Sequence, residues 1–449
     1  MADIVVVGAG ISGLVSSYYI LKKNPDAKIT LLEASDRAGG QILSVNLKAA
    51  SGTDTYDVGG AFVQKAQKDL MSLLKEFEIE TYPQPKGKRI TQLGDGTIKP
   101  YSGSIPPLPW SSLIDLHRFM SKLEGSAKKM NLTNPSESTK ADELDKTSVD
   151  EFKLKTLWTQ AAKDMADTLA GSVLRVDPKN ISVLYYEYIL GSTGGWDGLL
   201  GSSKDGLHRI KGGAEKIVNA LVEAIGKKNI KFNSKVTSIK HTNEGGDGLV
   251  SVEVSSGETY TAKKVIVTEG RDEIEFVPSA PVFPPLLPIA NTISFVITFA
   301  KAFWRDKGYS GEVLSIAGTM QHLTGEGEWS ATAIFDATSS DGNPALSGVL
   351  NPGPMGDKTS EDRKSEVLKL LAKYFPMENV DVLDYADHAW GGPWKYGDKL
   401  LTASSLDDRR KPFHSVHWAD RHTAMEWYNT IGGAVQVGYR AANEVLDCM

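Results

Sequence analysis

The first forty residues alternate between short apolar runs and one amphipathic segment. Residues 3–7 read Asp-Ile-Val-Val-Val, a β-branched run typical of a buried parallel strand. Residues 14–21 repeat apolar side chains with a helical period, and residues 28–32 form a second β-branched run. This order predicts a strand–helix–strand unit, the building block of a parallel α/β sheet.

The rest of the pattern predicts a helical middle and two further groups of strands. Apolar periodicity predicts helices over residues 70–77, 113–130, 214–225, 364–375 and 431–446, and several more between residues 148 and 190. Short apolar runs predict strands over residues 230–232, 235–240, 249–254, 265–268, 293–299 and 415–419, and a hairpin over residues 89–98. The polar segment 131–146 predicts a loop, and Ser148 with Glu151 has the spacing of a capping box.

A glycine-rich turn joins the first strand to the first helix. It reads Gly8-Ala9-Gly10-Ile11-Ser12-Gly13, a G-x-G-x-x-G. In such a turn the first glycine allows a tight bend, the second lets a pyrophosphate approach, and the third lets helix and strand pack closely. The helix N-terminus offers N–H groups to phosphates, and Glu33 can accept hydrogen bonds from ribose hydroxyls. We therefore predict a dinucleotide site here; the alternative is a glycine-rich turn in an ordinary α/β domain.

Composition and charge narrow the class of protein. The chain has 449 residues, 41% hydrophobic and 24% charged, which suits two or three globular domains. The net charge of −6 gives no general reason to expect nucleic acid or an anionic membrane as a partner. The histidines lack H-x-x-x-H or H-E-x-x-H spacing, so we predict no metal site.

Cysteine content and hydropathy bear on the compartment. Cys448 is the single cysteine, which excludes an intramolecular disulfide and is compatible with a reducing compartment. No run reaches the ~18 to 20 apolar residues that a membrane span needs. The sequence opens directly on its first strand, so we expect no signal peptide and a cytoplasmic protein.

The segment after the second strand indicates which dinucleotide is bound. Residues 33–40 read Glu-Ala-Ser-Asp-Arg-Ala-Gly-Gly, with Arg37 just past the ribose acid and a further close-approach glycine at Gly40, which suits FAD better than NAD. "VVVGAGISGL", "LLEASDRAGG" and "YDVGGAFV" stand in the order and spacing of the flavin-containing amine oxidases. The chain resembles this family, which includes monoamine and polyamine oxidases, over nearly its whole length.

The resemblance implies a fold and a set of cofactor contacts. The expected fold is α/β: a Rossmann-like FAD-binding domain (residues 1–85, 205–275 and 385–449) with an inserted mixed α+β substrate domain (residues 86–204 and 276–384). In the family, the segment Gly59-Gly60-Ala61 passes the isoalloxazine ring, and Val236 meets the adenine through its backbone. Ile431 opens a last helix whose N-terminus points at the flavin.

Other positions depart from the family where its cofactor phosphates lie. Two arginines that help to neutralise those phosphates are replaced by Ser35 and Gln41. The Ala-Gly-Thr-Glu pattern before the last helix reads Ala-Asp-Arg-His here, at residues 419–422. We hypothesise that Arg421, next to Asp420, takes over phosphate neutralisation; the alternative is a solvated surface arginine.

Three departures concern the reactive end of the flavin. The family lysine that holds a water against flavin N5 falls at Ser294 or, with an alignment gap, at Phe295, which argues against fast reaction with O2. Pro393 stands where monoamine oxidases have the cysteine that attaches FAD, so we expect non-covalent FAD. Trp394 and Thr430 fall at the two positions of the family's substrate-facing aromatic pair, so only half of that aromatic cage remains.

The resemblance implies an FAD-dependent oxidoreductase that oxidises a small molecule, with an amine C–N bond as the default target, by hydride transfer to flavin N5. We expect Trp394, Phe295, Thr430 and residues 170–210 to line the pocket. Tyr185, Tyr186, Tyr188 and Trp196 could line it too, or form helix core. Two alternatives remain: a flavin enzyme without oxidase activity, such as a double-bond isomerase or dehydrogenase, and a non-catalytic flavin-binding protein.

Overall fold

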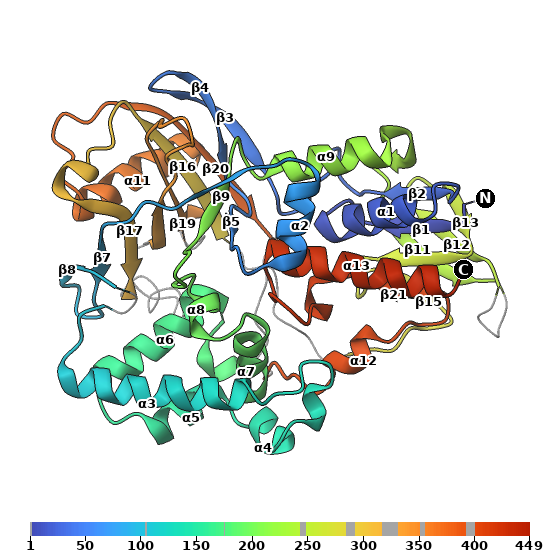
Figure 1. Ribbon diagram of the computed structural model, residues 1–449, viewed down its shortest axis with the longest axis horizontal. Coiled ribbons are helices and arrows are strands. Elements are labelled where there is room, and N and C mark those ends of the chain that lie inside the picture. The colour runs from blue at the N-terminus through green and yellow to red at the C-terminus, as the bar shows by residue number, and fades with distance from the viewer. Residues whose placement is uncertain are drawn as a thin grey trace.

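The computed structural model of the chain describes residues 2–103, 106–174, 176–242, 248–283, 292–316, 331–350, 355–391 and 400–449. Figure 1 shows a layered α/β part beside both chain termini, a large mixed sheet, and a block of helices.

The α/β part is built on a five-stranded parallel sheet. Its order is β10 (Ile230–Lys231), β2 (Ile29–Leu32), β1 (Ile4–Val7), β14 (Lys264–Val267) and β21 (Val416–Trp418). These strands come from three distant stretches of the chain, and each lies within one of the three segments predicted for the FAD-binding domain, a division that stays a prediction. The sheet therefore forms only when residues more than 400 positions apart in sequence come together.

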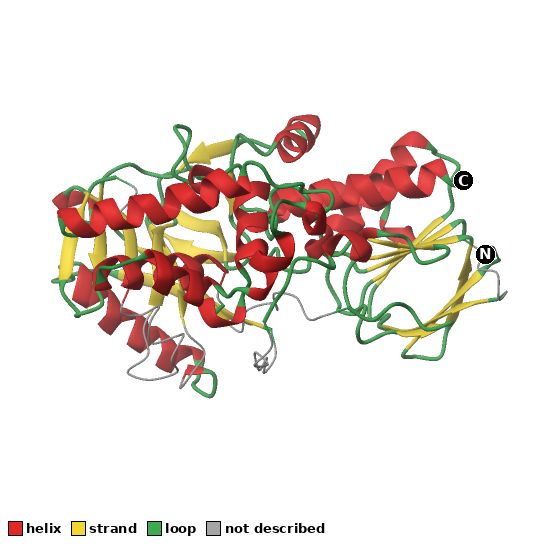
Figure 2. Ribbon diagram, turned by 90° about the horizontal axis from the view of Figure 1, so that it is seen from below, coloured by secondary structure: helices red, strands yellow, loops and turns green. Residues whose placement is uncertain are grey.

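Alternate side chains along the strands of this five-stranded sheet point to opposite faces and pack in two different hydrophobic cores. Ile4 and Val6 face a cluster shared with helices α1 (Ile11–Lys23), α9 (Glu215–Ile225) and α13 (Ile431–Asp447). Val5 and Val7 face a second sheet, whose order is β13 (Thr259–Ala262), β12 (Val250–Val254), β11 (Val236–His241) and β15 (Glu275–Val277). Figure 2 shows this arrangement from below, with the strands lying in layers against the helices.

The second large sheet has seven strands. Its order is β20 (Val382–Trp390), β16 (Thr292–Phe299), β19 (Ala345–Leu350), β18 (Ala331–Asp336), β17 (Tyr309–Ser315), β7 (Lys88–Gln92) and β8 (Ile98–Tyr101). Helix α11 (Ser360–Tyr374) covers one face through Ile293, Phe295 and Ile297. The hairpin β3 (Ser44–Ala49)–β4 (Gly52–Asp57) packs on the other face, beside Val296.

The helical block carries most of residues 110–199. It contains α3 (Trp110–Ala127), α4 (Ala141–Lys146), α5 (Val149–Thr156), α6 (Gln160–Leu174), α7 (Val183–Ser192) and α8 (Trp196–Leu199). The capping box that starts α5 is confirmed, because the Ser148 side chain accepts from the Glu151 N–H and Glu151 accepts from the Ser148 N–H. The prediction of a loop over residues 131–146 is wrong in part: this stretch holds the 3-10 helix Pro135–Glu137 and α4, which polar composition concealed.

Short elements connect these parts. Strands β5 (Phe62–Val63), β9 (His208–Ile210) and β6 (Thr81–Pro83) form a small sheet between them, next to helix α2 (Lys68–Glu76). The described residues also contain helix α12 (Leu406–Arg410) and the 3-10 helices Pro178–Asn180, Lys227–Asn229, Arg305–Lys307 and Arg421–Thr423. The predicted domain boundary at residue 385 falls inside β20, which pairs with β16 from Val382 to Trp390.

Candidate active site

The carboxyl ends of the parallel strands bring four loops to one edge of the sheet. Val7 is in register with Leu32 on one side and with Val267 on the other, and Val267 is in register with Trp418. The residues that follow each strand therefore lie side by side. In open α/β sheets, ligands bind outside this carboxyl edge, and we call it the cofactor edge.

The glycine turn at the cofactor edge packs tightly on the protein but leaves room at one point. Gly8 has φ +98°, and a Cβ there would lie 2.2 Å from Thr268 Oγ1. A Cβ at Gly13 would lie 2.0 Å from the Gly8 carbonyl oxygen, whereas one at Gly10 would meet no atom within 4 Å. The turn thus presents open space at Gly10, beside the N-terminus of α1, which no side chain caps. This geometry fits a pyrophosphate, and Ser12 stands in the first turn of the same helix.

Glu33 is held in a fixed position at the edge. Its Oε2 accepts from the Ala9 N–H at 2.7 Å, and its Oε1 accepts from the Ser35 N–H and hydroxyl at 2.9 and 2.7 Å. The Ser234 N–H donates to the Glu33 carbonyl at 2.8 Å, so the start of β11 at Val236 lies close by. Glu33, the predicted ribose-binding acid, and Val236, the predicted adenine contact, therefore lie near each other at the cofactor edge.

Arg37 holds the second glycine segment together. Its Nη1 donates to the Ile42 carbonyl at 2.9 Å and its Nη2 to the Gly40 carbonyl at 2.6 Å. The Gly39 N–H donates to the Ala9 carbonyl, which presses this segment against the glycine turn. Arg37 therefore has a structural task at the cofactor edge, and its predicted role toward phosphate stays a prediction.

The N-terminus of α13 meets the segment Gly59-Gly60-Ala61. A Cβ at Gly60 would lie 2.9 Å from Ile42 Cδ1 and 3.6 Å from Ile431 Cγ1, so a glycine is required for this close approach. Thr430 caps α13: its hydroxyl oxygen accepts from the Gly433 N–H at 3.2 Å and from Gln67 Nε2 at 3.2 Å. The hydroxyl of Thr430 also donates to the Trp427 carbonyl, so all its hydrogen bonds stabilise the start of α13.

Charged side chains that no motif in the sequence indicates surround Asp420 and Arg421. The Asp420 carboxylate accepts from the His422 N–H at 2.9 Å and lies near the guanidinium groups of Arg271 and Arg409. Arg271 stacks on the Trp418 ring at 3.4 Å. Burial raises the pKa of the Asp420 carboxyl, and the neighbouring arginines oppose that rise.

Glu269 adds a further carboxylate at this edge, two residues after the last paired residue of β14. The surrounding protein removes water from it and raises its pKa, while Arg421 acts in the opposite direction. The same rule that identified Glu33, a polar residue directly after a β-branched strand, could have found Glu269.

A chain of polar contacts joins the helical block to the loop before α13. The ring Nδ1 of His422 lies 2.6 Å from the Tyr428 hydroxyl, which in turn hydrogen-bonds to the Tyr185 hydroxyl of α7. Burial and the nearby Arg421 and Arg409 lower the pKa of His422 well below 6.5, so its imidazole is neutral at pH 7. Tyr428 itself has a pKa well above its ordinary value because it is buried.

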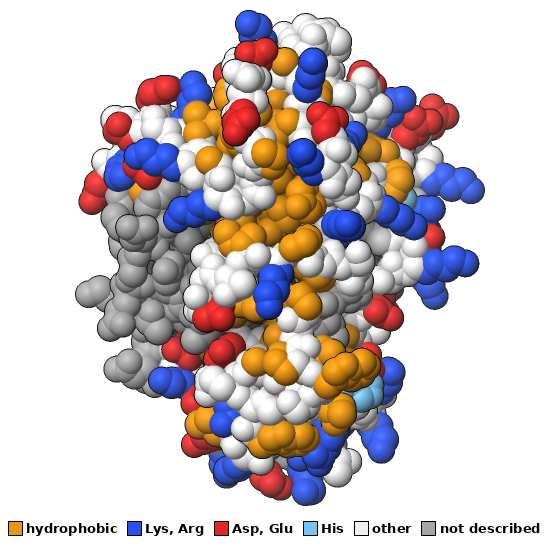
Figure 3. All heavy atoms as spheres, turned by 90° about the vertical axis from the view of Figure 1, so that its left-hand side faces the viewer, with side chains coloured by type: hydrophobic (Ala, Val, Ile, Leu, Met, Phe, Trp, Pro, Cys, Tyr) orange, Lys and Arg blue, Asp and Glu red, His pale blue; other side chains and the backbone are white. Residues whose placement is uncertain are grey.

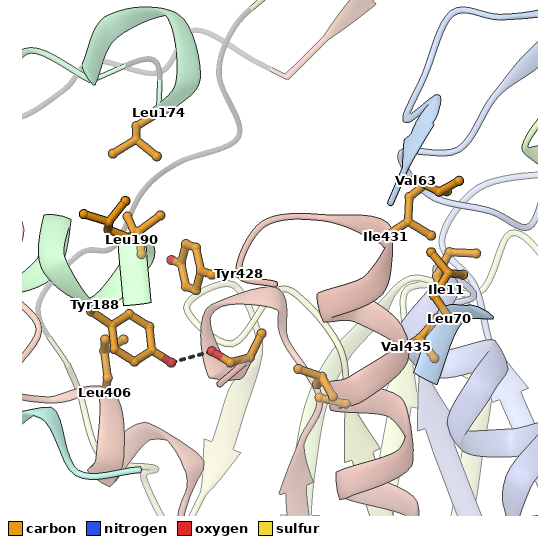
Figure 4. Close-up of a cluster of buried hydrophobic side chains, with 14 of the residues drawn as sticks. Ile11, Val63, Leu70, Leu174, Tyr188, Leu190, Leu406, Tyr428, Ile431 and Val435 are labelled. Carbon is orange, nitrogen blue, oxygen red and sulfur yellow. Dashed lines mark hydrogen bonds between the residues drawn. The ribbon is translucent and has the colours of Figure 1, made fainter. Parts of the chain in front are cut away.

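Tyr188 makes the second contact between these parts. Its hydroxyl donates to the Ala424 carbonyl, the dashed line in Figure 4, and Arg410 Nη2 donates to that hydroxyl at 2.6 Å. The aromatic group predicted as pocket lining or helix core is buried: Tyr185, Tyr186 and Tyr188 are at most 2% exposed and Trp196 is 7% exposed. Tyr185 and Tyr188 thus hold the loop before α13 through their hydrogen bonds to Tyr428 and Ala424.

The seven-stranded sheet presents Ser294 on the face opposite α11. Ser294 is in register with His388 of β20 and Val349 of β19, and residues directly opposite in antiparallel strands share a face. His388 contacts Trp390, whose Nε1 donates to the Val58 carbonyl at 3.0 Å, just before Gly59. Ser294, His388 and Trp390 therefore lie beside the segment predicted to pass the flavin. His388 was missed because only the sheet register reveals it.

The expectation that Phe295 lines the pocket is wrong. Strand side chains alternate between faces, and Phe295 points into the core beneath α11, where it is 1% exposed. Pro393 and Trp394 lie outside the described residues, so the aromatic half of the predicted cage stays a prediction.

Comparison with known proteins identifies the family. The family model for flavin containing amine oxidoreductases matches residues 11–446.

The chain belongs to this family. It is 28% identical to an amine oxidase [flavin-containing] of Oncorhynchus mykiss, over 99% of this chain and 85% of that protein. It is 26% identical to amine oxidase [flavin-containing] B of Homo sapiens, over 100% of this chain and 86% of that protein. Family membership makes the chain a flavin-dependent oxidoreductase and favours amine oxidation over the isomerase, dehydrogenase and non-catalytic alternatives.

Solved structures confirm the fold class. A wild-type putrescine oxidase bound to putrescine superposes with a TM-score of 0.83 at 22% identity, covering 99% of both chains. Cyclohexylamine oxidase from Brevibacterium oxydans IH-35A gives a TM-score of 0.83 at 21% identity, again over 99% of both chains.

Among the described residues, no helix is long and apolar enough to cross a membrane. That part of the chain also contains no group of three or more His, Cys, Asp or Glu side chains placed to hold a metal.

Proposed function

We propose that this amine oxidase family member binds FAD non-covalently and oxidises a small amine. The observation that carries the proposal is the cofactor edge, where the open space at Gly10, the uncapped N-terminus of α1 and the fixed carboxylate of Glu33 meet. Cys448, the single cysteine, lies at the exposed end of α13, which supports a cofactor without a covalent link. We also propose a cytoplasmic location, since one exposed thiol suits a reducing compartment.

Named residues would hold each part of FAD. Glu33 would accept from the ribose hydroxyls, the backbone near Val236 would meet the adenine, and the turn from Gly8 to Gly13 would hold the pyrophosphate. Arg421 carries a positive charge at this same edge, next to Asp420 and close enough to act on the Glu269 carboxyl, while Arg271 and Arg409 act on Asp420. This charge arrangement supports the hypothesis that Arg421 replaces the arginines lost at Ser35 and Gln41.

The protein would orient the flavin and the substrate. FAD, when bound, supplies a hydride-accepting ring. Gly60 packs closely against Ile431 at the start of α13, and the positive end of that helix dipole would stabilise negative charge there. We place the substrate between this helix start and the partly exposed sheet face around Ser294, with Trp394 as its candidate aromatic wall. No side chain is assigned as a catalytic acid or base.

Anaerobic titration of the purified protein with a panel of amines tests this proposal. We expect a flavin absorption spectrum that bleaches with at least one amine and recovers in air with release of peroxide. Acid precipitation should release the flavin into the supernatant, since the link is non-covalent. Flavin bands that no amine bleaches, but an unsaturated substrate does without peroxide, would shift the assignment to an isomerase or dehydrogenase. A colourless protein that cannot be reconstituted with FAD would overturn the cofactor assignment.

A further inference from the structure

A buried arginine lies beside the segment that we expect to pass the flavin. Arg209 is on β9, the central strand of the small sheet, in register with Phe62 of β5 on one side and with Tyr82 of β6 on the other. It is only 3% exposed. We propose that Arg209 supplies a fixed positive charge that favours the reduced, negatively charged flavin ring. The inference rests on the proposed FAD cofactor and concerns how this chain would tune it.

The position of Arg209 follows from its contact with Phe62. Phe62 comes directly after Ala61, the last residue of the segment predicted to pass the isoalloxazine ring. The Arg209 guanidinium lies over the Phe62 ring, with its Cζ 4.5 Å from the ring centroid. The next residue of β5, Val63, lies beside Ile431 at the start of α13 in Figure 4. Arg209 is therefore one aromatic ring behind the place where this segment and α13 meet.

A hydrogen bond ties Arg209 to the sheet face on which we place the substrate. Arg209 Nη2 donates to the Ser347 hydroxyl at 2.9 Å. Ser347 is in register with Val296 of β16, and Val296 is two residues from Ser294, on the same face of that strand. The contacts of Arg209 with Phe62 and with Ser347 thus both lie on the side of the seven-stranded sheet that faces away from α11.

The charge of Arg209 is only partly offset by the protein. Among the described residues, no carboxylate forms an ion pair with it, although Asp336 and Asp57 are close enough to act on it. Asp336 pairs with Arg305 at 2.8 Å, and Asp57 accepts from the Ser44 hydroxyl at 2.6 Å. Burial raises the pKa of the Asp57 carboxyl, and the charge of Arg209 opposes that rise. An arginine stays protonated in a protein, so a positive charge remains behind Phe62.

The other titratable groups on this side are neutral at pH 7. Burial raises the pKa of Tyr82 to about 12, and it lowers the pKa of His388, which stands opposite Ser294. Figure 3 shows Lys and Arg side chains that extend into solvent on the side of the molecule with the seven-stranded sheet, where water and salt screen them. Arg209 is shielded from water, so its charge acts more strongly on its surroundings.

A buried positive charge matters to a ring that gains negative charge. A hydride carries two electrons and one proton, so a ring that accepts it gains one negative charge unless it takes up a further proton. Charges attract each other more strongly in a protein interior than in water, so Arg209 would stabilise the reduced ring over the oxidised one. Charges near a flavin tune its electronics in this way. Arg209 acts through space, behind Phe62, and is therefore not a catalytic residue.

The two-electron reduction potential of the bound flavin tests the inference. It is measured without oxygen, by equilibration of the purified protein with a reference dye. We expect Arg209→Met to lower the equilibrium constant for reduction by at least about tenfold, which is about 30 mV for a two-electron couple. Arg209→Lys keeps the charge and should recover most of the wild-type potential. The measurement needs no amine, so the result does not depend on which substrate the protein oxidises.

Two matched variants separate the charge from other effects. Lys211→Met removes a cation two residues further along, at an exposed position that pairs with Glu80, and should leave the potential unchanged. Ser347→Ala removes the hydrogen bond to Arg209 but keeps the charge, and should also leave it unchanged. A wild-type potential in Arg209→Met would overturn the inference, and so would an equal shift in Lys211→Met, in Ser347→Ala or in Arg209→Lys.

The wild type provides a second test that does not depend on the folding of a variant. If the reduced ring stays negatively charged, one proton accompanies the two electrons, and the potential falls by about 30 mV per pH unit. A fall of about 60 mV per unit between about pH 5.5 and 6.5 would mean that a second proton is taken up, and would overturn the inference. A protein that binds no FAD would overturn the proposed function as well, whereas a bound flavin that is indifferent to Arg209 would overturn this inference alone.

Discussion

Ser35 and Arg37, at the cofactor edge, form hydrogen bonds within the protein that the family pattern does not predict. Ser35 replaces a family arginine, yet its N–H and hydroxyl orient the Glu33 carboxylate. Arg37, the cation that remains in that segment, donates to backbone carbonyls of its own loop. Since these hydrogen bonds occupy Arg37, Arg421 is our candidate for a further positive charge near the pyrophosphate.

Replacing Arg421 by alanine tests this charge assignment. We expect Arg421→Ala to weaken FAD retention by about 1.5–3 kcal/mol, the range for hydrogen bonds to charged groups. Flavin content after gel filtration and the dissociation constant of re-added FAD measure the effect. Arg421→Lys keeps the charge and should recover part of the affinity. Unchanged flavin content in Arg421→Ala would show that Arg421 does not hold the phosphates.

At the scale of elements, the turn from β1 into α1 combines two opposite requirements. Gly13 must be small because the Gly8 carbonyl lies where its Cβ would be, and this lets the helix pack close to the strand. At Gly10, by contrast, a Cβ would meet no protein atom within 4 Å, so packing within the protein does not require a glycine there. The first requirement concerns folding, and we propose that the second concerns the bound cofactor.

Two alanine substitutions in this turn should therefore separate folding from cofactor binding. Gly13→Ala creates a backbone clash, and we expect it to lower the free energy of unfolding by about 1–3 kcal/mol, as overpacking does. Gly10→Ala should leave the stability of the flavin-free protein within about 1 kcal/mol but abolish FAD binding. Urea unfolding of the flavin-free proteins and FAD titration measure the two properties. Tight FAD binding by Gly10→Ala would contradict the assignment of the open space.

At the scale of the whole molecule, the helical block and the cofactor edge are tied together by buried polar contacts. Tyr185 and Tyr188 of α7 reach the loop that leads into α13, and Arg410 of α12 supports Tyr188. Any shift of the helical block would therefore move the start of α13. The block also carries a buried carboxylate, Glu187, which makes the stability of the whole protein depend on pH.

Glu187 should make the protein less stable as the pH rises. Burial raises its pKa from 4.5 to about 7, although the Ser126 hydroxyl donates to it. The folded state keeps this proton to a higher pH than the unfolded state, so the contribution is fully present below pH 4.5 and is lost as the pH rises through about 7. Glu187→Gln should therefore stabilise the protein by about 1–3 kcal/mol at pH 8 and little at pH 4.5.

Thermal unfolding of Glu187→Gln across this pH range checks the sign. Glu143→Gln, at an exposed position of α4, is a matched control that should leave the pH profile unchanged. A Glu187→Gln variant whose unfolding temperature follows the wild type at every pH would show that the glutamate is not desolvated as the structure indicates.

Local patterns were enough to predict the regular elements that form the frame of the site. The G-x-G-x-x-G turn, Glu33, the capping box at Ser148 and the last helix from Ile431 all follow from short-range chemistry: periodicity, glycine geometry and caps. The prediction of a flavin cofactor rests on the family resemblance, because several of these motifs occur in the order and spacing found in the family. Residues 131–146 were predicted wrongly because polar composition hides two short helices that pack on their neighbours.

The strand–helix–strand unit, the cofactor class and the loss of the family lysine and arginines can all be predicted from residues that lie close together in the chain. Which distant residues meet depends on the fold. The register of β16 with β20 placed His388 opposite Ser294 and turned Phe295 into the core. The parallel alignment of β14 and β21 gathered Glu269 and Asp420 at the cofactor edge, and the pairing of β5 with β9 placed Arg209 against Phe62. Long-range pairing sets these contacts, and no local pattern in the sequence encodes them.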